Sequence, residues 1–327
     1  MYLLSRVASS IYWLSRYIER AENNARIINV NLQLALEAET GGERGVGAHW
    51  TPVINTLEDQ ERFYSLHPVA NGETVCNYMT FAEDNPNSIV NCLAFARENA
   101  RTVREQISTE MWEQINKMHL FMRSPEARQL LANSPYDFYR HVIEGSYLFQ
   151  GVTDTTMNRT EGYAFMRFGR YLERADYTSR ILDVKYHILL PRGELVGGTV
   201  DIIQWMAVLS SCSAAEAYRK AYAGPIAPWK VAEFLALHPD FPRSLLFCVT
   251  ALDRALHSIS GEKSEAFSSE AERCSGALRY RLTYSTIKQI FRVGLHEFLD
   301  ELQLRLIEIG EAAHTLYCEN EHPKIVA

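Results

Sequence analysis

One charged helical segment occurs twice in this chain, and that repeat limits the possible folds more than any other feature of the sequence. Residues 16–30 read RYIERAENNARIINV, and residues 170–184 read RYLERADYTSRILDV. Arg, Tyr, Glu, Arg and Ala recur at identical places, and other differences are conservative, such as Glu22 against Asp176. Self-similarity at a fixed, long spacing is typical of a duplicated structural unit. The sequence therefore predicts two copies of one helix.

Two further matches follow in the same order. Trp50 corresponds to Trp205, and the segment 75–92 corresponds to 231–248, with Val, Asp, Pro, Ser and Cys in common. In both copies the long helix is followed by the tryptophan, then by a short apolar segment, and then by an Asp-x-Pro-x-Ser sequence. Three matches in register are not expected by chance, so they indicate a tandem duplication.

Helix-breaking residues are few, and strand signals are absent from the sequence. No Gly or Pro lies between Tyr2 and Thr40, which leaves room for a helix of about 55 Å. Asn85-Pro86 and Ser124-Pro125 each predict a helix start, with a capping side chain before a proline. We therefore expect an all-α, multi-helix bundle of two tandemly duplicated halves, residues 1–157 and 158–327. The halves are expected to pack as one globular unit with approximate twofold pseudo-symmetry.

Composition excludes several classes of protein. The formal net charge is −7 and the pI is about 5.8, whereas a nucleic-acid surface needs a basic excess, so no nucleic-acid partner is expected. No run approaches the roughly 18 apolar residues of a membrane span. The six cysteines form no CxxC pair and are expected to be reduced, which favours a cytoplasmic protein. The histidines form no HExxH sequence, and an ExxH such as that at 311–314 is too little for a di-iron site, so we expect no metal ion and no cofactor on this chain.

The repeated segment combines an apolar stripe with a charged face. The stripe recurs every three or four positions, as expected for a helix that packs into a core: Leu14, Ile18, Ala21, Ala25, Ile28 and Leu32. Charged residues lie on the opposite side of the same helix. They are the candidate ligand-binding residues of the chain: Arg16, Glu19, Arg20 and Arg26 in the first copy and Arg170, Glu173, Arg174 and Arg180 in the second.

This charged face has three interpretations. Glu and Arg on a helix usually form a solvated face, with Glu19 near Arg16 and Glu22 four residues before Arg26. A salt-bridge network that locks helices together is the second interpretation. In the third, the guanidinium groups bind a carboxylate or phosphate, for which their planar donor geometry is suited. If the halves pack with twofold pseudo-symmetry, the two charged faces can confront each other across a cleft.

A second basic stripe lies near the middle of the first half. Arg97, Arg101 and Arg104 share one side of the predicted helix, with Arg97 beside Glu98 and Arg101 four residues before Glu105. An exposed face with ordinary ion pairs is the favoured interpretation. The alternative is a second ligand-binding stripe, formed by Arg97, Glu98, Asn99 and Arg101.

These motifs resemble the alpha-E domain family, a bacterial all-helical family named for its Glu-Arg motif. The resemblance covers nearly the whole chain. Similar segments are MYLLSRVASSIYWLSRYIERAENNARI, DNPNSI with ARENARTVREQIS, YAFMRFGRYLERADYTSRILDVKY, and CSAAEAYRKAY with VAEFLALHPDFPRS. The resemblance carries the Glu-Arg motif onto Arg16, Glu19, Arg20, Arg26, Arg170, Glu173, Arg174 and Arg180. It carries a second set of family positions onto Asn85, Pro86, Ser88, Arg97, Glu98, Asn99 and Arg101.

The resemblance also implies a biochemical setting. Such proteins are typically encoded beside, or fused to, a circularly permuted ATP-grasp ligase, and often near a transglutaminase-like peptidase. The chain is then expected to be the non-ATP-binding component of a peptide- or amide-bond-forming pathway, with ATP and Mg²⁺ on the partner ligase. Its ligand would be an anionic peptide or acyl intermediate, bearing a carboxylate or phosphate, held at the two Glu-Arg helices.

Two other classes of function stay open at this stage. The chain can be a non-catalytic scaffold whose polar faces dock the ATP-grasp partner. It can also be an enzyme, an amide-forming transferase with Glu19 or Glu173 as general base. Arginines beside a carboxylate lower its pKa, whereas a general base needs a raised one, so catalysis by these glutamates is disfavoured. A homo-oligomer is compatible with the sequence.

Overall fold

The computed structural model describes residues 3–41, 50–56, 59–188, 199–262 and 266–319, and every regular element in that part is helical. The all-α prediction is confirmed for these residues. The elements are α1 Ser5–Gly41, α2 Trp50–Thr56, α3 Gln60–Leu66, α4 Gly72–Thr80, α5 Ile89–Thr102, α6 Thr109–Arg123, α7 Pro125–Asn133, α8 Pro135–Thr156, α9 Glu161–Ile188, α10 Thr199–Ser211, α11 Ala215–Ala221, α12 Pro228–Leu237, α13 Leu245–Ser260, α14 Glu270–Tyr284, α15 Ile287–Val293, α16 Leu295–His314 and the short π-helical turn η2 Thr315–Glu319. Among the described helices, none has the length and apolarity needed to cross a membrane.

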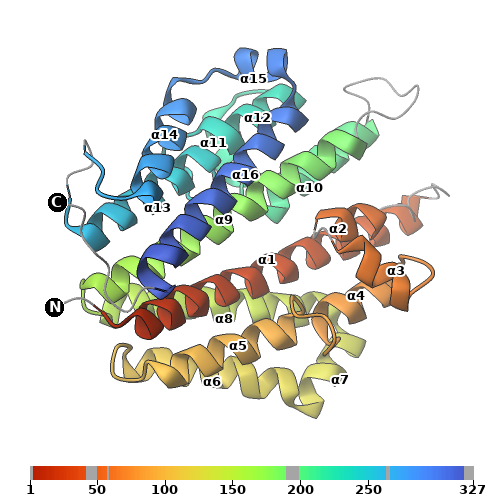
Figure 1. The fold of residues 1–327 in the computed structure, drawn as a ribbon. Coiled ribbons are helices and arrows are strands. Elements are labelled where there is room, and N and C mark those ends of the chain that lie inside the picture. Colours follow the sequence, from red (N-terminus) through yellow and green to blue (C-terminus); the bar gives the residue numbers. More distant parts are fainter. Residues whose placement is uncertain (1–2, 42–49, 57–58, 189–198, 263–265, 320–327) are drawn as a thin grey trace.

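Two long helices, α1 and α9, lie side by side through the middle of the molecule (Figure 1). The Ser15 hydroxyl on α1 donates to the Met166 carbonyl on α9 at 2.6 Å. About two turns further along α1 and three turns further along α9, the Tyr177 hydroxyl donates to the Asn23 carbonyl, also at 2.6 Å. Because residue numbers rise together along both helices, α1 and α9 run parallel.

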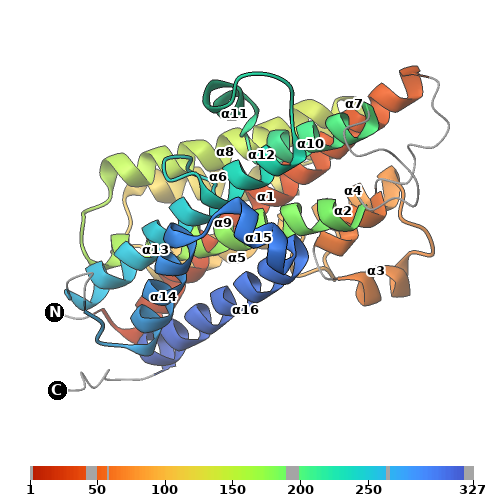
Figure 2. The ribbon, with the colours of Figure 1, turned by 90° about the horizontal axis from the view of Figure 1, so that it is seen from above.

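The remaining helices pack on either side of this central pair. α5 and α8 pack against α1, whereas α13 and α16 pack against α9, and Figure 1 shows the two groups on opposite sides. α2, α3 and α4 lie together at one end of the central helices in both views (Figures 1 and 2). α6 bridges α5 and α8, and α14 bridges α13 and α16. The predicted boundary between residues 157 and 158 falls in the link between α8 and α9.

The apolar stripe predicted for the first long helix is confirmed. Five of its members are completely buried, namely Leu14, Ile18, Ala21, Ala25 and Ile28, whereas Leu32 at its end is partly buried. The corresponding stripe of α9 is buried as well: Phe168, Leu172, Ala175, Ser179 and Leu182. Since α1 contacts helices on several sides, its charged side is also enclosed, and the prediction of a solvated face is wrong for Glu19, Glu22 and Arg26.

One of the two predicted helix starts is confirmed. Ser124 accepts a hydrogen bond from the Ala127 amide, and Pro125 is the first residue of α7. Asn85 does not cap α5, because its side chain donates to the Tyr78 carbonyl and accepts from the Asn87 amide. The N-cap of α5 is Ser88. The Asn-Pro dipeptide instead shapes the loop before that helix.

Small residues let α1 and α9 approach closely. Gly169 faces the backbone of α1, and a Cβ built there would lie 2.5 Å from the Tyr12 carbonyl oxygen and 3.3 Å from the Ser15 Cβ. Neither of these neighbours is the flexible end of a side chain. Any larger residue at this position must therefore move one helix away from the other.

We predict that Gly169→Ala lowers the free energy of unfolding by about 2–3 kcal/mol, since overpacking in a close-packed interface has costs of this size. The matched control is Gly151→Ala on α8, where a Cβ would meet nothing within 4 Å. There the better helix propensity of Ala should stabilise the chain by about 0.5–1 kcal/mol. Urea unfolding followed by circular dichroism measures both changes. Equal effects of the two substitutions would contradict the close approach of α1 and α9.

Candidate functional site

The Glu173 carboxylate on α9 is held by two arginines of α1. Arg20 donates to it twice, through Nε at 2.6 Å and Nη2 at 3.0 Å. Arg16 donates through Nε at 2.7 Å, and its Nη1 donates to the Tyr12 hydroxyl at 2.8 Å. Glu173 is buried, with 5% of its surface exposed. The predicted local pair between Arg16 and Glu19 is wrong, because Arg16 reaches across to the other helix.

The Glu19 carboxylate on α1 is held in the reciprocal way. Arg174 of α9 donates to both of its oxygens, through Nε at 2.7 Å and Nη2 at 2.8 Å. Arg243, in the loop before α13, adds a third contact from Nη1 at 3.2 Å. Glu19 is completely buried. The two Glu-Arg segments therefore meet directly through reciprocal ion pairs, rather than facing each other across a cleft.

Glu22 extends this network toward α8. Arg26 pairs with it from four residues away at 2.8 Å, which confirms the predicted intrahelical pair. The Ser146 hydroxyl donates to Oε2 of Glu22 at 2.7 Å, whereas Arg243 donates to Oε1, the oxygen that Arg26 also contacts. Arg243 further donates to the Asn23 amide oxygen at 3.0 Å. Arg243 is thus central to the network, although it lies outside the repeated Glu-Arg segments and the sequence did not predict it.

The loops before α5 and α13 bind the central helices at matching places. Asn24 and Arg20 donate to the carbonyl and the side-chain oxygen of Asn87, at 2.6 and 2.8 Å. In the other half, Thr178 donates to the Arg243 carbonyl at 3.0 Å. Asn87 and Arg243 occupy the position between Pro and Ser in the two Asp-x-Pro-x-Ser sequences. The sequence could have indicated this position, because in both loops it comes directly before the serine that caps the next helix.

Two carboxylates of the network, Glu173 and Glu22, are ionised at neutral pH. Burial by itself raises the pKa of Glu173, but Arg20 and Arg16 outweigh it and lower the pKa to about 2. Burial acts in the same direction on Glu22, where Arg243 and Arg26 outweigh it and again give a pKa of about 2. A general base that works near neutral pH needs a raised pKa. Neither carboxylate has that property.

The other predicted arginines lie at the margins of the network. Arg26 donates to the Ser213 hydroxyl at 2.5 Å and to the Tyr147 hydroxyl, as well as pairing with Glu22. Arg180 pairs with Asp176 of its own helix at 2.8 Å. Arg170 is 6% exposed and lies 3.6 Å from the Asp154 carboxylate. Within the described residues its Nε and Nη2 have no hydrogen-bond partner.

The second predicted stripe is an exposed helix surface with local pairs. Arg97 pairs with Glu98 at 2.8 Å, as predicted, and also donates to Asn116. Arg101 pairs with Glu98 at 2.8 Å rather than with Glu105, and Asn99 donates to the carbonyl one turn earlier on its own helix. Arg97 also lies over the Trp112 ring, 5.4 Å from its centroid. These residues are not brought together with the Glu-Arg network.

A groove opens beside the network, between α1, α9 and α16. It has a volume of about 480 Å³, and its lining includes Trp13, Arg16, Ile307, Glu311 and Glu319. The Arg16 guanidinium lies over the Trp13 ring, 4.9 Å from its centroid, with 19% of the side chain exposed. Arg16 is therefore the network arginine that reaches this groove.

One group of side chains has donor atoms suited to a metal ion. Asp183, His296 and Asp300 each offer one ligand atom, and these atoms lie within 4.8 Å of one another. The hydrogen bond to Asp183 raises the pKa of the His296 imidazole. Asp183 is on α9 near the end of the repeated segment 170–184, whereas the other two residues are on α16.

Fold and site together define a class: an all-helical protein whose two central helices are joined by reciprocal, buried Glu-Arg pairs. The chain belongs to the Alpha-E family, described as a predicted alpha-helical domain with a conserved ER motif, which it matches over residues 3–317. The resemblance inferred from the sequence is thus confirmed. Glu19-Arg20 and Glu173-Arg174 are the Glu-Arg dipeptides of the two repeated segments.

Similar proteins occur in mycobacteria. An uncharacterised protein of Mycobacterium bovis and one of Mycobacterium tuberculosis are each 24% identical to this chain over 339 aligned positions. The match covers 94% of this chain but 35% of each relative, so the chain spans about a third of the length of the curated relatives it matches. No solved structure matches the chain.

We predict that Glu173→Gln destabilises the chain far more than Glu98→Gln, because only the first leaves largely buried arginines without their counter-charge. Unpairing a buried ion pair costs about 3–5 kcal/mol, and the value should lie near the lower limit since Arg16 and Arg20 are about one-fifth exposed. The exposed Glu98 pairs should contribute less than about 1 kcal/mol. Chemical unfolding at neutral pH measures both.

The difference in unfolding free energy between wild type and Glu173→Gln should depend on pH. The pKa of Glu173 is about 2 in the folded chain and about 4.3 in an unfolded one, so its stabilisation is present above about pH 5 and is lost as the pH falls toward 2. The difference in unfolding free energy between wild type and Glu173→Gln should shrink over that range. A difference that stays constant down to pH 2 would contradict the ionised, arginine-bound carboxylate.

Proposed function

We propose that the chain is a component of an ATP-grasp-associated pathway that forms peptide or amide bonds, and that it binds a carboxylate- or phosphate-bearing peptide or acyl intermediate. The ligand's anionic group would be held at Arg16, in the groove between α1, α9 and α16. The other Glu-Arg residues would then hold the two central helices together. In this proposal the site lies at the edge of the Glu-Arg network rather than in its middle.

This proposal rests on the hydrogen bonding of the Arg16 guanidinium group. Its Nε donates to Glu173 and its Nη1 to Tyr12, and neither contact uses Nη2. All three nitrogens of Arg20 are engaged, two by Glu173 and one by Asn87. Those of Arg174 are also engaged, by Glu19 and the Pro242 carbonyl. Among these three arginines, Arg16 is the one with a guanidinium nitrogen, Nη2, that makes no hydrogen bond to the described residues, and this nitrogen can donate to a ligand.

The groove lining narrows the class of ligand. Trp13 and the half-exposed Ile307 offer apolar surface, while Glu311 and Glu319 place carboxylates on the same lining as Arg16. A ligand with only negative charges would be repelled by these acids. A zwitterion, such as an amino acid or a short peptide with free ends, satisfies both signs. Its carboxylate would pair with Arg16 and its ammonium group with the acidic residues.

Tandem duplication, with repeats at residues 1–157 and 158–327, forms part of the same proposal. Reciprocal pairs support it, since Arg20 holds Glu173 and Arg174 holds Glu19. The order of packing also supports it, because α1 contacts α5 and α8 as α9 contacts α13 and α16. Approximate twofold pseudo-symmetry would relate the two central helices across their contact.

An ATP-grasp ligase is the proposed partner, and ATP with Mg²⁺ would be bound there. The family resemblance motivates this part of the proposal. The greater length of the mycobacterial relatives is compatible with a module that works beside a further domain. Two assays follow from the proposal, one for ligand binding and one for docking.

We predict that the tripeptide Ala-Leu-Ala binds with free ends and that its C-terminal amide binds at least about tenfold more weakly, since a charge-assisted hydrogen bond is worth about 1.5–3 kcal/mol. Arg16→Gln should abolish the difference between the two peptides. Isothermal titration calorimetry measures both affinities. Arg97→Gln is the matched control, because Arg97 is also partly exposed, ion-paired and stacked over a tryptophan.

A second variant separates loss of the binding site from loss of the fold. Ile307→Glu changes a half-exposed lining residue that is not part of the Glu-Arg network, so the chain should keep its thermal transition while losing the peptide. Equal binding of the acid and the amide, or peptide binding that survives both Arg16→Gln and Ile307→Glu, would contradict a site at this groove.

A scaffold that docks the ligase without binding small ligands is the second candidate. Exposed apolar side chains on α14 and α15 favour it, namely Tyr280, Tyr284, Phe291 and Val293. We predict that an ATP-grasp ligase encoded beside this chain co-purifies with it, and that Tyr284→Glu with Phe291→Glu weakens the complex. Co-purification without any peptide binding would select the scaffold over the first proposal. Absence of a complex would contradict the scaffold.

A further inference from the structure

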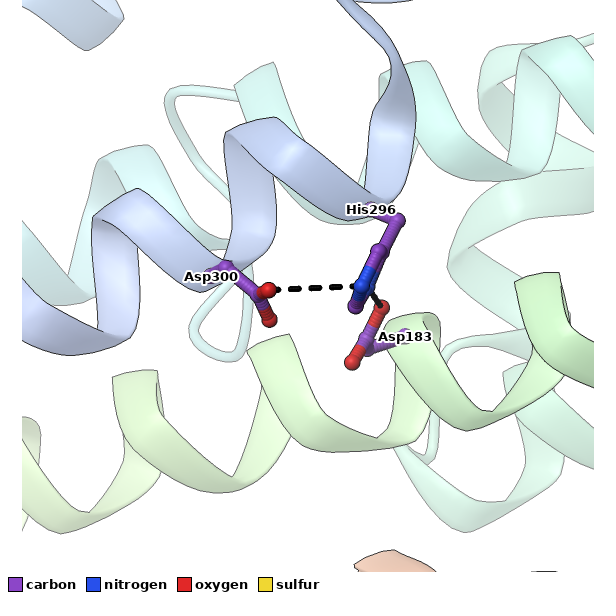
Figure 3. A group of neighbouring side chains, drawn as sticks. All are labelled: Asp183, His296 and Asp300. Carbon is purple, nitrogen blue, oxygen red and sulfur yellow. Dashed lines mark hydrogen bonds and ion pairs between the residues drawn. The ribbon is translucent and has the colours of Figure 1, made fainter.

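His296 lies between two aspartates from different helices (Figure 3). Its Nδ1 is 2.6 Å from an Asp183 carboxylate oxygen on α9. Its Nε2 is 3.3 Å from an Asp300 carboxylate oxygen, one turn further along α16. The side chains are partly accessible, with exposed fractions of 16% for Asp183, 29% for His296 and 52% for Asp300. The cluster can therefore be reached from solvent.

The separation between His296 and Asp300 suits two ligands of one metal ion. Residues four apart on a helix share a face, so both side chains can turn toward a common point. Bonds of about 2.0–2.1 Å at a tetrahedral zinc place neighbouring ligand atoms about 3.3 Å apart. The observed Nε2–Oδ2 distance is 3.3 Å. Little movement of either side chain is needed to admit the ion.

Asp183 completes the arrangement from the other helix. A metal-bound histidine commonly donates its second ring N–H to a carboxylate, which fixes the ring and leaves the other nitrogen to bind the metal. The contact between Asp183 and Nδ1 has this form. The donor atoms of all three residues lie within 4.8 Å of one another, so Asp183 belongs to the same cluster as the two ligand residues.

We propose that Asp183, His296 and Asp300 form a binding site for a divalent transition-metal ion of the zinc class. His296 Nε2 and Asp300 supply ligand atoms, Asp183 orients the imidazole, and water fills the remaining positions. Two carboxylates and a neutral imidazole carry a charge that balances a divalent cation. The ion would connect α9 with the beginning of α16, away from the Glu-Arg network and independently of the proposed peptide groove.

The test is titration of the chelator-treated chain with ZnCl₂ by calorimetry and with CoCl₂ by visible absorption. One ion per chain is expected, with a d–d band for Co²⁺ in a nitrogen- and oxygen-containing site. His296→Ala and Asp300→Asn should abolish this binding. Asp183→Asn should weaken it by about 10–100-fold, the usual effect of removing a carboxylate that orients a ligand histidine.

The matched control is His314→Ala. His314 Nδ1 also lies 3.3 Å from a carboxylate oxygen, that of Glu319, but without the two-sided arrangement found at His296. This variant should keep the full stoichiometry and affinity. Metal-free thermal unfolding of each variant checks that the fold is retained. If Zn²⁺ does not bind, or if its binding is unchanged in His296→Ala, the cluster is an internal ion-pair group and the proposal is wrong.

Discussion

Desolvation of two glutamates between parallel helices is the constraint on which the rest of the structure depends. Glu19 and Glu173 are removed from water, and an unpaired carboxylate in such a place costs several kcal/mol. Each is compensated by a guanidinium from the other helix, Arg174 for Glu19 and Arg20 for Glu173. A shift of one helix by a single turn would break both compensations at once. The pairs therefore fix the register of α1 against α9.

Register and free energy of folding come from different contacts here. A buried ion pair adds little net stability when compared with apolar residues of the same size, because its attraction is offset by lost hydration. The buried stripes of α1 and α9 provide the favourable burial instead, with residues such as Ile18 and Leu172. Close approach at Gly169 brings the helices near enough for the guanidinium groups to reach across. The ion pairs then determine the register in which the two closely packed helices meet.

Periodicity and repetition predicted much of this molecule from the sequence. The long first helix, its apolar stripe and the importance of the repeated Glu and Arg residues could all be deduced before the fold was known. Their partners could not, because a helical wheel shows which residues share a face but not whether another helix covers that face. The spacing of charges therefore predicts ion pairs only within one helix, such as Arg16 with Glu19. In the structure Arg16 pairs with Glu173 of the other helix. A search for residues that are identical in the two repeats cannot find Arg243, because its counterpart in the first repeat is Asn87.

That difference between Asn87 and Arg243 breaks the symmetry of the network. Glu173 receives its second guanidinium from Arg16, whereas Glu19 receives its second one from Arg243. The residue that corresponds to Arg16 in the second repeat is Arg170, which faces Asp154 instead. If the halves are duplicated as proposed, a single changed loop position made one of the two original arginines dispensable to the network. Arg16 lines the groove and Arg170 does not, so a ligand site there would take its arginine from the first repeated segment alone.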